Sequence, residues 1–151
     1  MRAPFQVLVI PFVRGVEERI QFAALRRSDS SEWQGVAGGG EVGETPEEAA
    51  LREASEELGV SCAKRSLIKL QTMASIPVIH FRNRQGWPDG QYVIPEYSFG
   101  IELESGFVSL SDEHNLYRWG VFEEINSLLR WDSNRTALWE LNERLVKNDI
   151  K

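Results

Sequence analysis

Residues 38–60 of this 151-residue chain read GGGEVGETPEEAALREASEELGV, and they carry its whole net charge. The stretch holds seven acidic residues and one basic residue, Arg52. The other 16 acidic and 16 basic residues cancel, so the net charge of −6 belongs to this segment. Charge gathered on one short segment indicates a positively charged ligand, and a divalent cation is the first candidate.

The same stretch predicts a glycine-rich turn followed by a helix over Pro46–Leu58. Thr45 suits the N-cap, Pro46 suits the first helical position, and Glu48 completes a capping box. Gly59 stands where a left-handed residue ends a helix. The boundaries of this helix can therefore be read directly from the residues.

Three glutamates crowd together on this helix, because Glu53, Glu56 and Glu57 are three and four residues apart. Two of them lie in the last turn, where the helix dipole disfavours negative charge. Arg52 reaches Glu56 one turn on, but one cation cannot neutralise three carboxylates. An acidic helix face is most often simply solvated. Here the acids lie at the unfavourable helix end behind a glycine-rich loop, which favours a hard cation such as Mg²⁺, with Mn²⁺ as a substitute.

The segment resembles the Nudix box, G-x5-E-x7-R-E-U-x-E-E-x-G-U, where U is a bulky aliphatic residue. Ala54, at the first U position, is the one departure, and it should thin the packing behind the helix while leaving the chemistry intact. The resemblance implies an α/β/α sandwich around a mixed β-sheet, with the box helix against the core. The matching positions are Gly38, Glu44, Arg52, Glu53, Glu56, Glu57, Gly59 and Val60.

The whole chain, residues 1–151, is expected to form a single α/β domain, with 42% hydrophobic residues to build its core. No apolar run is long enough to cross a membrane, and no signal-peptide pattern is present. Cys62 is the only cysteine, which excludes an internal disulfide and agrees with a reducing cytoplasm. The sequence pI of about 5.0 and the absence of a basic stripe argue against nucleic-acid binding.

Hydrophobic periodicity predicts six strands and three helices. The apolar run Val7–Phe12 is short and is interrupted by Pro11, and it is expected to be a buried strand, while residues 83–90 are expected to form a loop. The predicted strands are Val7–Phe12, Phe22–Arg27, Gly35–Gly38, Ser66–Ile76, Tyr92–Leu103 and Tyr117–Gly120. The predicted helices are Pro46–Leu58, Phe122–Leu129 and Asn134–Val146.

A substrate-binding region is suggested by Arg26, Arg27 and Trp33. Two arginines leaving a strand could hold phosphate oxygens, and a nearby tryptophan could stack on a planar ring. The alternative is that the arginines are solvated and that Trp33 covers the core.

The resemblance also implies an acid outside the box that completes the metal site. Glu113, in a polar loop before an apolar strand, is our first choice. His114 is expected to orient a neighbour or lie at the surface, because hard cations prefer oxygen ligands, and His80 is expected to be a core or sheet residue. The rival acids are Asp112, Glu104, Glu102 and Glu96.

The resemblance implies roles for these groups. The carbonyl of Gly38 and the carboxylates of the box would hold the metal together with Glu113. Arg52 would orient Glu56, and Glu44 would support the loop or an outer water. Glu113 is our first choice for the general base, and two glutamates of the box are the alternatives. The metal ligands are expected to be Gly38, Glu53, Glu56, Glu57 and Glu113. The alternative bases are Glu53 and Glu56.

Two further segments, EWQGVAGGGEVGET and SLSDEHNLYRWGVFEEINSLLRWDSNRTALWEL, are similar to the Nudix subgroup that hydrolyses dihydroneopterin triphosphate in folate biosynthesis. This resemblance implies release of pyrophosphate from a nucleotide-like triphosphate, by a monomer or homodimer. One alternative is a hydrolase of dinucleoside polyphosphates, nucleoside triphosphates or oxidised nucleotides. Another is a non-catalytic ligand-binding regulator, which the intact R-E-x-x-E-E set disfavours.

Overall fold

The computed structural model describes residues 1–150, which form a seven-stranded mixed sheet and three α-helices. No helix within these residues is long and apolar enough to span a membrane. The strands are β1 (Arg2–Arg14), β2 (Ile20–Arg27), β3 (Trp33–Gln34), β4 (Val36–Glu41), β5 (Leu67–Pro77), β6 (Val93–Glu102) and β7 (His114–Gly120). The helices are α1 (Pro46–Leu58), α2 (Phe122–Leu128) and α3 (Asp132–Lys147).

Strand β1 organises the sheet, because it pairs with three other strands. Along one edge it lies parallel to β6, from Gln6 to Phe12. Along the other edge it pairs first with β4, up to Val9, and then with β2, from Phe12 onward. The sheet therefore has two branches on this edge of β1. One branch is β4, and the other is β2, which pairs with both β3 and β7.

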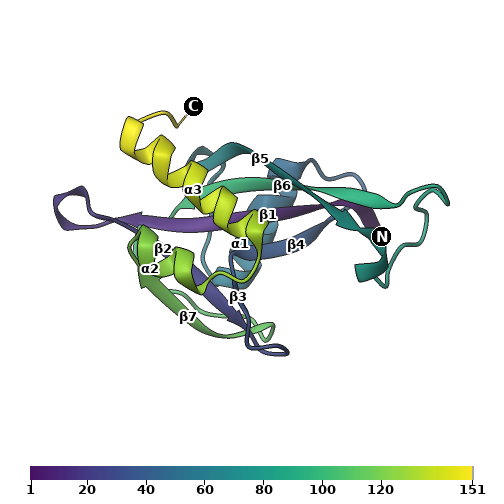
Figure 1. The fold of residues 1–151 in the computed structure, drawn as a ribbon, viewed down its shortest axis with the longest axis horizontal. Coiled ribbons are helices and arrows are strands. Elements are labelled where there is room, and N and C mark those ends of the chain that lie inside the picture. The colour runs from purple at the N-terminus through teal and green to yellow at the C-terminus, as the bar shows by residue number, and fades with distance from the viewer. Residues whose placement is uncertain (151) are drawn as a thin grey trace.

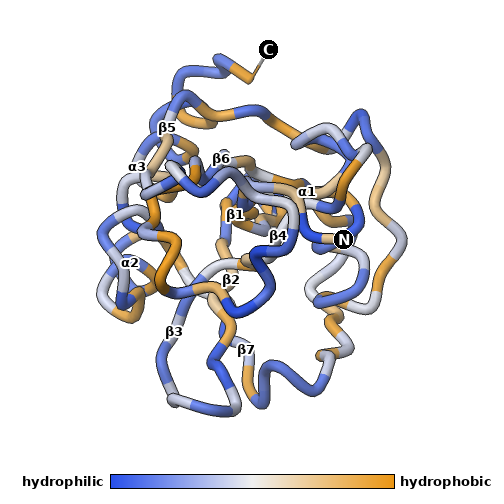
Figure 2. Tube along the Cα trace, turned by 90° about the vertical axis from the view of Figure 1, so that its right-hand side faces the viewer, coloured by the Kyte–Doolittle hydropathy of each residue, from blue (hydrophilic) through white to orange (hydrophobic). Residues whose placement is uncertain are grey.

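Two helices cover opposite faces of this sheet, as Figure 1 shows with α3 in front and α1 behind. The end-on view in Figure 2 places β1 between them. Each helix packs on its own hydrophobic cluster: Leu138 and Leu141 of α3 belong to one, and Ala50 and Leu58 of α1 to the other. The expected α/β/α sandwich is confirmed.

The first strand is longer than the sequence suggested, since β1 continues through Pro11. Pro11 lies between the residues that pair with β4 and those that pair with β2. A proline, which lacks an N–H donor, is tolerated where a strand edge changes partners. The expected strand at 35–38 corresponds to β4, which begins one residue later and continues to Glu41, and the short strand β3 was not predicted. His80 is exposed in a short 3-10 turn, Val78–His80, so its expected place in the core or sheet was wrong.

Candidate active site

Helix α1 begins and ends where the sequence predicted. The Thr45 side chain accepts a hydrogen bond from the Glu48 amide, and Glu48 bonds back to the Thr45 amide, so the capping box is complete. Gly59 ends the helix with φ of 65°. The caps set the ends of α1, and its apolar face, with Ala50 and Leu58, packs in the core cluster. In this orientation the side chains of Glu53 and Glu57 are largely buried, and that of Glu56 is 56% exposed.

Gly38 and Glu53 are in close contact across the gap between β4 and α1. A Cβ atom at position 38 would lie 2.1 Å from the Glu53 carboxyl carbon, so only glycine leaves room for this carboxylate. Burial raises the pKa of Glu53 to about 7, although Arg52 acts in the opposite direction. A bound cation would stabilise the charged form of such a partly desolvated carboxylate.

Arg52 is the centre of a hydrogen-bond network that links the helix to the glycine-rich loop. It donates to both carboxylate oxygens of Glu44, at 2.7 and 2.9 Å, and to Glu53 at 2.9 Å. A fourth bond runs to the Gly39 carbonyl at 2.9 Å. The expected partner Glu56 is farther away, with 3.5 Å between Nη1 and Oε2. Arg52 therefore holds Glu53 and Glu44 more closely than Glu56.

Glu57 is buried, with 4% of its surface exposed, and is held by two side chains from the other end of the chain. Its Oε2 accepts hydrogen bonds from Ser111 Oγ at 2.6 Å and from His114 Nδ1 at 3.0 Å. Burial acts to raise the pKa of Glu57, but these hydrogen bonds outweigh it and the pKa falls below its usual range. Glu57 is thus held as an oriented carboxylate.

Glu113 lies next to this group, at the turn before β7. Its backbone carbonyl accepts a hydrogen bond from the Ser28 amide. Burial and the nearby charge of Glu57 raise the pKa of Glu113, while His114 and Arg27 act against the rise. Two of the rival acids face elsewhere: Glu102 pairs with Arg14 at 3.5 Å, and Glu104 is exposed.

The residues suit a hard divalent cation, since the donors gathered at Gly38 and Glu53 and around Glu57 and Glu113 are all oxygen atoms. Within residues 1–150, no three acidic, histidine or cysteine side chains lie close enough together to hold a metal ion by themselves. Mg²⁺ sites commonly combine one or two carboxylates with substrate phosphates, and such a site does not need three protein side chains.

A cavity of about 670 Å³ opens on the α3 side of the sheet. Arg27 lines it, and the pKa of Arg27 is raised first by Asp29 and more weakly by Glu113 and Glu57. Arg27 also pairs with His114 across β2 and β7, and His114 bonds to Glu57, so Arg27 connects the cavity wall to the acidic group. Other lining side chains are Gln6, Gln34, Glu96, Phe81, Trp131 and Asn134.

The three residues expected to bind substrate separate in the structure. Arg27 lines the cavity and is held by two 2.9 Å hydrogen bonds to Asp29. Arg26 instead donates to Asn115 of β7, because neighbouring strand residues point to opposite faces. Trp33 is partly buried against the core cluster and is not among the residues that line the cavity. Trp131, 44% exposed, does line it.

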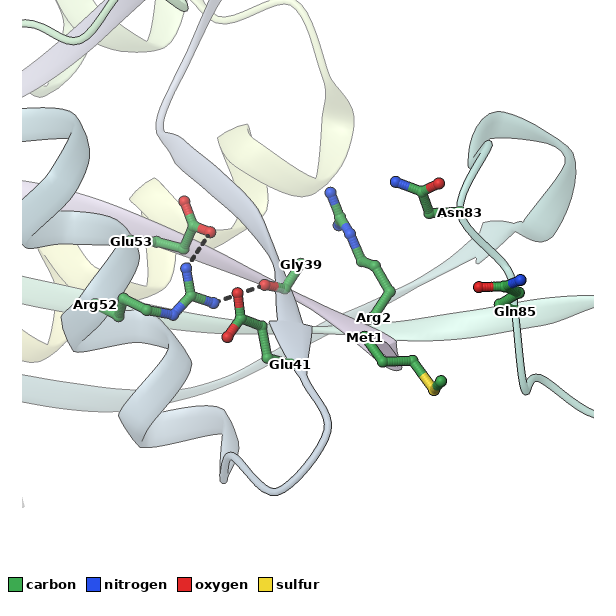
Figure 3. A pocket seen from close by; sticks show the side chains of 8 residues that line it. All are labelled: Met1, Arg2, Gly39, Glu41, Arg52, Glu53, Asn83 and Gln85. Atoms are coloured by element: carbon green, nitrogen blue, oxygen red, sulfur yellow. Dashed lines mark hydrogen bonds and ion pairs between the residues drawn. The ribbon is translucent and has the colours of Figure 1, made fainter.

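A second cavity, of about 500 Å³, is lined by Glu53 and Arg52, neither of which lines the first cavity. Figure 3 shows Arg52 and Glu53 on one side of it and Asn83 and Gln85 of the predicted loop on the other, with Arg2 between them. The Arg2 guanidinium lies over Gly39, where a Cβ atom would be only 1.6 Å from Nη1.

Comparison with known proteins agrees with this geometry. The family model described as the NUDIX domain matches residues 5–139. A Listeria monocytogenes protein described as a NUDIX hydrolase superimposes with a TM-score of 0.85, at 47% identity, over 99% of each chain. The chain belongs to the Nudix family. It is a Nudix pyrophosphohydrolase, and small nucleotide-like molecules are the substrates of this class.

Two comparisons point to one subgroup. The chain is 29% identical, over 91% of both sequences, to the dihydroneopterin triphosphate diphosphatase of Escherichia coli K12. The structure of the E. coli dihydroneopterin triphosphate pyrophosphohydrolase superimposes with a TM-score of 0.74, at 27% identity, over 93% of this chain and 97% of that one. The expected resemblance to this subgroup is confirmed.

Sequence reasoning did not identify most of the cavity lining. Gln34, Trp131 and Asn134 lie in the two segments that resemble the subgroup, but nothing in those segments marked them as cavity residues, and Gln6 lies in neither segment. A polar residue within an otherwise apolar strand pattern was an available signal, and Gln6 is of that kind.

Proposed function

We propose that this enzyme hydrolyses dihydroneopterin triphosphate to its monophosphate and pyrophosphate in a Mg²⁺-dependent reaction, with Mn²⁺ able to substitute. The observation that carries the proposal is the similarity to the E. coli diphosphatase along 91% of both sequences. The geometry adds support, because Arg27 lines a cavity large enough for a bicyclic ring and pairs with His114, the residue that bonds to Glu57 of the box.

The groups that would hold Mg²⁺ are Glu53, Glu56, Glu57, Glu113 and the Gly38 carbonyl, with one or two carboxylates and the substrate phosphates on each ion. A bound Mg²⁺ supplies charge neutralisation at the phosphates and a bound water of lowered pKa. His114 and Ser111 keep Glu57 in one orientation, and Arg52 does the same for Glu53. Such outer partners commonly matter tenfold or more for activity.

Glu113 is proposed as the general base that takes the proton of the attacking water. Its pKa is raised by burial and by Glu57, and a base works best with a pKa moved toward the working pH. Glu53, whose pKa is about 7, is the alternative from the box. Arg27 would hold phosphate oxygens where the cavity meets the acids.

The metal requirement is tested with purified protein and a pyrophosphate-release assay. EDTA should abolish turnover and Mg²⁺ should restore it. Glu57→Gln should lower kcat by about tenfold or more because a buried ligand loses its charge. Glu47→Gln is the control on the same helix. The Glu47 side chain is 38% exposed, and its ion pair with Lys69 is long, at 3.9 Å, so the activity of this variant should be unchanged. Full turnover in EDTA would contradict the proposal.

Multiple turnovers in this assay would also exclude the reading as a non-catalytic regulator. The reducing cytoplasm remains our proposed compartment, in keeping with a single free cysteine, Cys62.

A further inference from the structure

Glu96 is a buried carboxylate in the wall of the large cavity. Only 5% of its surface is exposed, and its Oε1 accepts no hydrogen bond from any residue in the range 1–150. A buried acceptor without a partner costs stability, so such groups commonly serve a purpose outside the fold itself. The sequence offered Glu96 only as a rival metal ligand, whereas the structure places it among residues that line the cavity.

The strand register fixes the position of Glu96. It lies in β6, with Gln6 of β1 opposite on one side and Ala74 of β5 opposite on the other. All three residues line the cavity, which makes this row of the sheet one wall of it. Burial raises the pKa of the carboxyl group, while Ser133, at the start of α3, and Gln6 act as hydrogen-bonding neighbours that lower it, and Oε1 itself has no partner. Glu96 is therefore held on rigid elements.

Among the described residues that line the cavity, Glu96 is the one with an unpartnered buried side-chain atom. Two other buried side-chain atoms within residues 1–150 lack partners, Ser98 Oγ and His114 Nε2, and neither residue lines the cavity. The neighbouring amide Asn134 is already engaged, because its Oδ1 accepts a hydrogen bond from the Gly35 amide at 2.8 Å. Glu96 is thus the buried acceptor with capacity left for a ligand.

A carboxylate has two acceptor oxygens side by side and no donor. It matches a ring edge that presents two parallel donors. The 2-amino-4-oxo edge of a pterin, like the corresponding edge of guanine, presents a ring N–H beside an amino group. Adenine presents one donor beside one acceptor, which a carboxylate cannot satisfy.

We propose that Glu96 binds the 2-amino-4-oxo edge of the substrate ring and selects pterin and guanine rings over adenine. The inference rests on the proposed function, since it assigns the ring subsite of the same active site. Burial raises the pKa of Glu96, and two donors from a ring would favour its charged form.

The test is the near-isosteric change Glu96→Gln, which replaces one acceptor by a donor. With Mg²⁺, kcat/KM should fall about 10- to 100-fold for dihydroneopterin triphosphate and for dGTP, because a buried donor of the ring is left unpaired. Activity on dATP should hold or rise, since the amide complements the adenine edge. Glu104→Gln, an exposed change on the segment after β6, should alter none of these values. Equal losses on all three substrates, or none, would overturn the inference.

Ring binding can also be measured without the metal or the phosphates. Neopterin fluorescence titrations in EDTA should give a Kd at least about tenfold weaker for Glu96→Gln than for wild type or Glu104→Gln. An unchanged Kd would refute the role of Glu96.

The dGTP arm separates this inference from the proposed function. If the wild type does not hydrolyse dihydroneopterin triphosphate but Glu96→Gln still lowers the dGTP-to-dATP ratio, the substrate proposal fails and the ring-edge inference stands. If the wild type prefers the pterin over dATP and Glu96→Gln keeps that preference, only the inference fails.

Discussion

Gly38→Ala should inactivate the enzyme without unfolding it. The added Cβ would lie 2.1 Å from the Glu53 carboxyl carbon, and ordinary contacts begin at 3.4 Å, so this carboxylate must retreat by 1.3 Å, the difference between the two. Arg52 holds the carboxylate on its other side at 2.9 Å. A misplacement of about 1 Å in an active site can cost about 10²-fold in rate. We therefore expect kcat/KM to fall about 100-fold, which corresponds to about 2.7 kcal/mol.

The assay for Gly38→Ala is steady-state pyrophosphate release over a range of Mg²⁺ concentrations, with circular dichroism to monitor folding. Higher Mg²⁺ should recover part of the activity if the displaced carboxylate is a ligand. Gly90→Ala is the matched control, because nothing lies within 4 Å of its Cβ position and its φ is not positive. A fully active Gly38→Ala enzyme would refute the placement of Glu53 against Gly38.

Further substitutions test other parts of the site. Glu113→Gln should lower kcat about 10²- to 10⁴-fold in the same assay if it removes the general base, whereas a larger loss from Glu104→Gln would move the base to the end of β6. Trp131→Ala should raise KM for the substrate. Trp33→Ala should mainly lower the unfolding free energy, by about 2 to 4 kcal/mol, as measured by urea denaturation. The reverse result would place Trp33 in the substrate site. In EDTA, the raised pKa of Glu53 means that the folded state binds its proton more tightly than the unfolded chain. Stability from this group is therefore lost as pH rises through about 7, and Glu53→Gln should stabilise the protein at pH 8 but hardly at pH 5. Equal effects at both pH values would contradict that pKa.

Local signals in the sequence predicted α1 to the residue. Thr45, Glu48 and Gly59 specify its ends through hydrogen bonds within a few residues, and such bonds do not depend on the rest of the fold. Spacing alone also grouped Glu53, Glu56 and Glu57 on one face, whereas the structure largely buries the first and last of these side chains and leaves Glu56 56% exposed. The strand ends were less accurate, because the partner that a strand edge meets, as at Pro11, is decided by distant segments.

The contacts that complete the site are nonlocal, and the sequence could not order them. Glu57 meets Ser111 and His114 across more than fifty residues of chain, and Arg52 prefers Glu44 to the helical neighbour Glu56. Helix spacing predicts contacts between residues one turn apart on the same helix. It cannot predict contacts with residues that the sheet brings close from distant parts of the chain.

Hydrolysis of dihydroneopterin triphosphate is the most direct test of the account. Purified protein with Mg²⁺ should be compared on this compound, dATP, GTP and diadenosine tetraphosphate, with products followed by ³¹P NMR. We predict the highest kcat/KM for the pterin and a single pyrophosphate signal beside the monophosphate. A higher kcat/KM for diadenosine tetraphosphate, or release of two separate phosphates from the pterin, would contradict the proposed function.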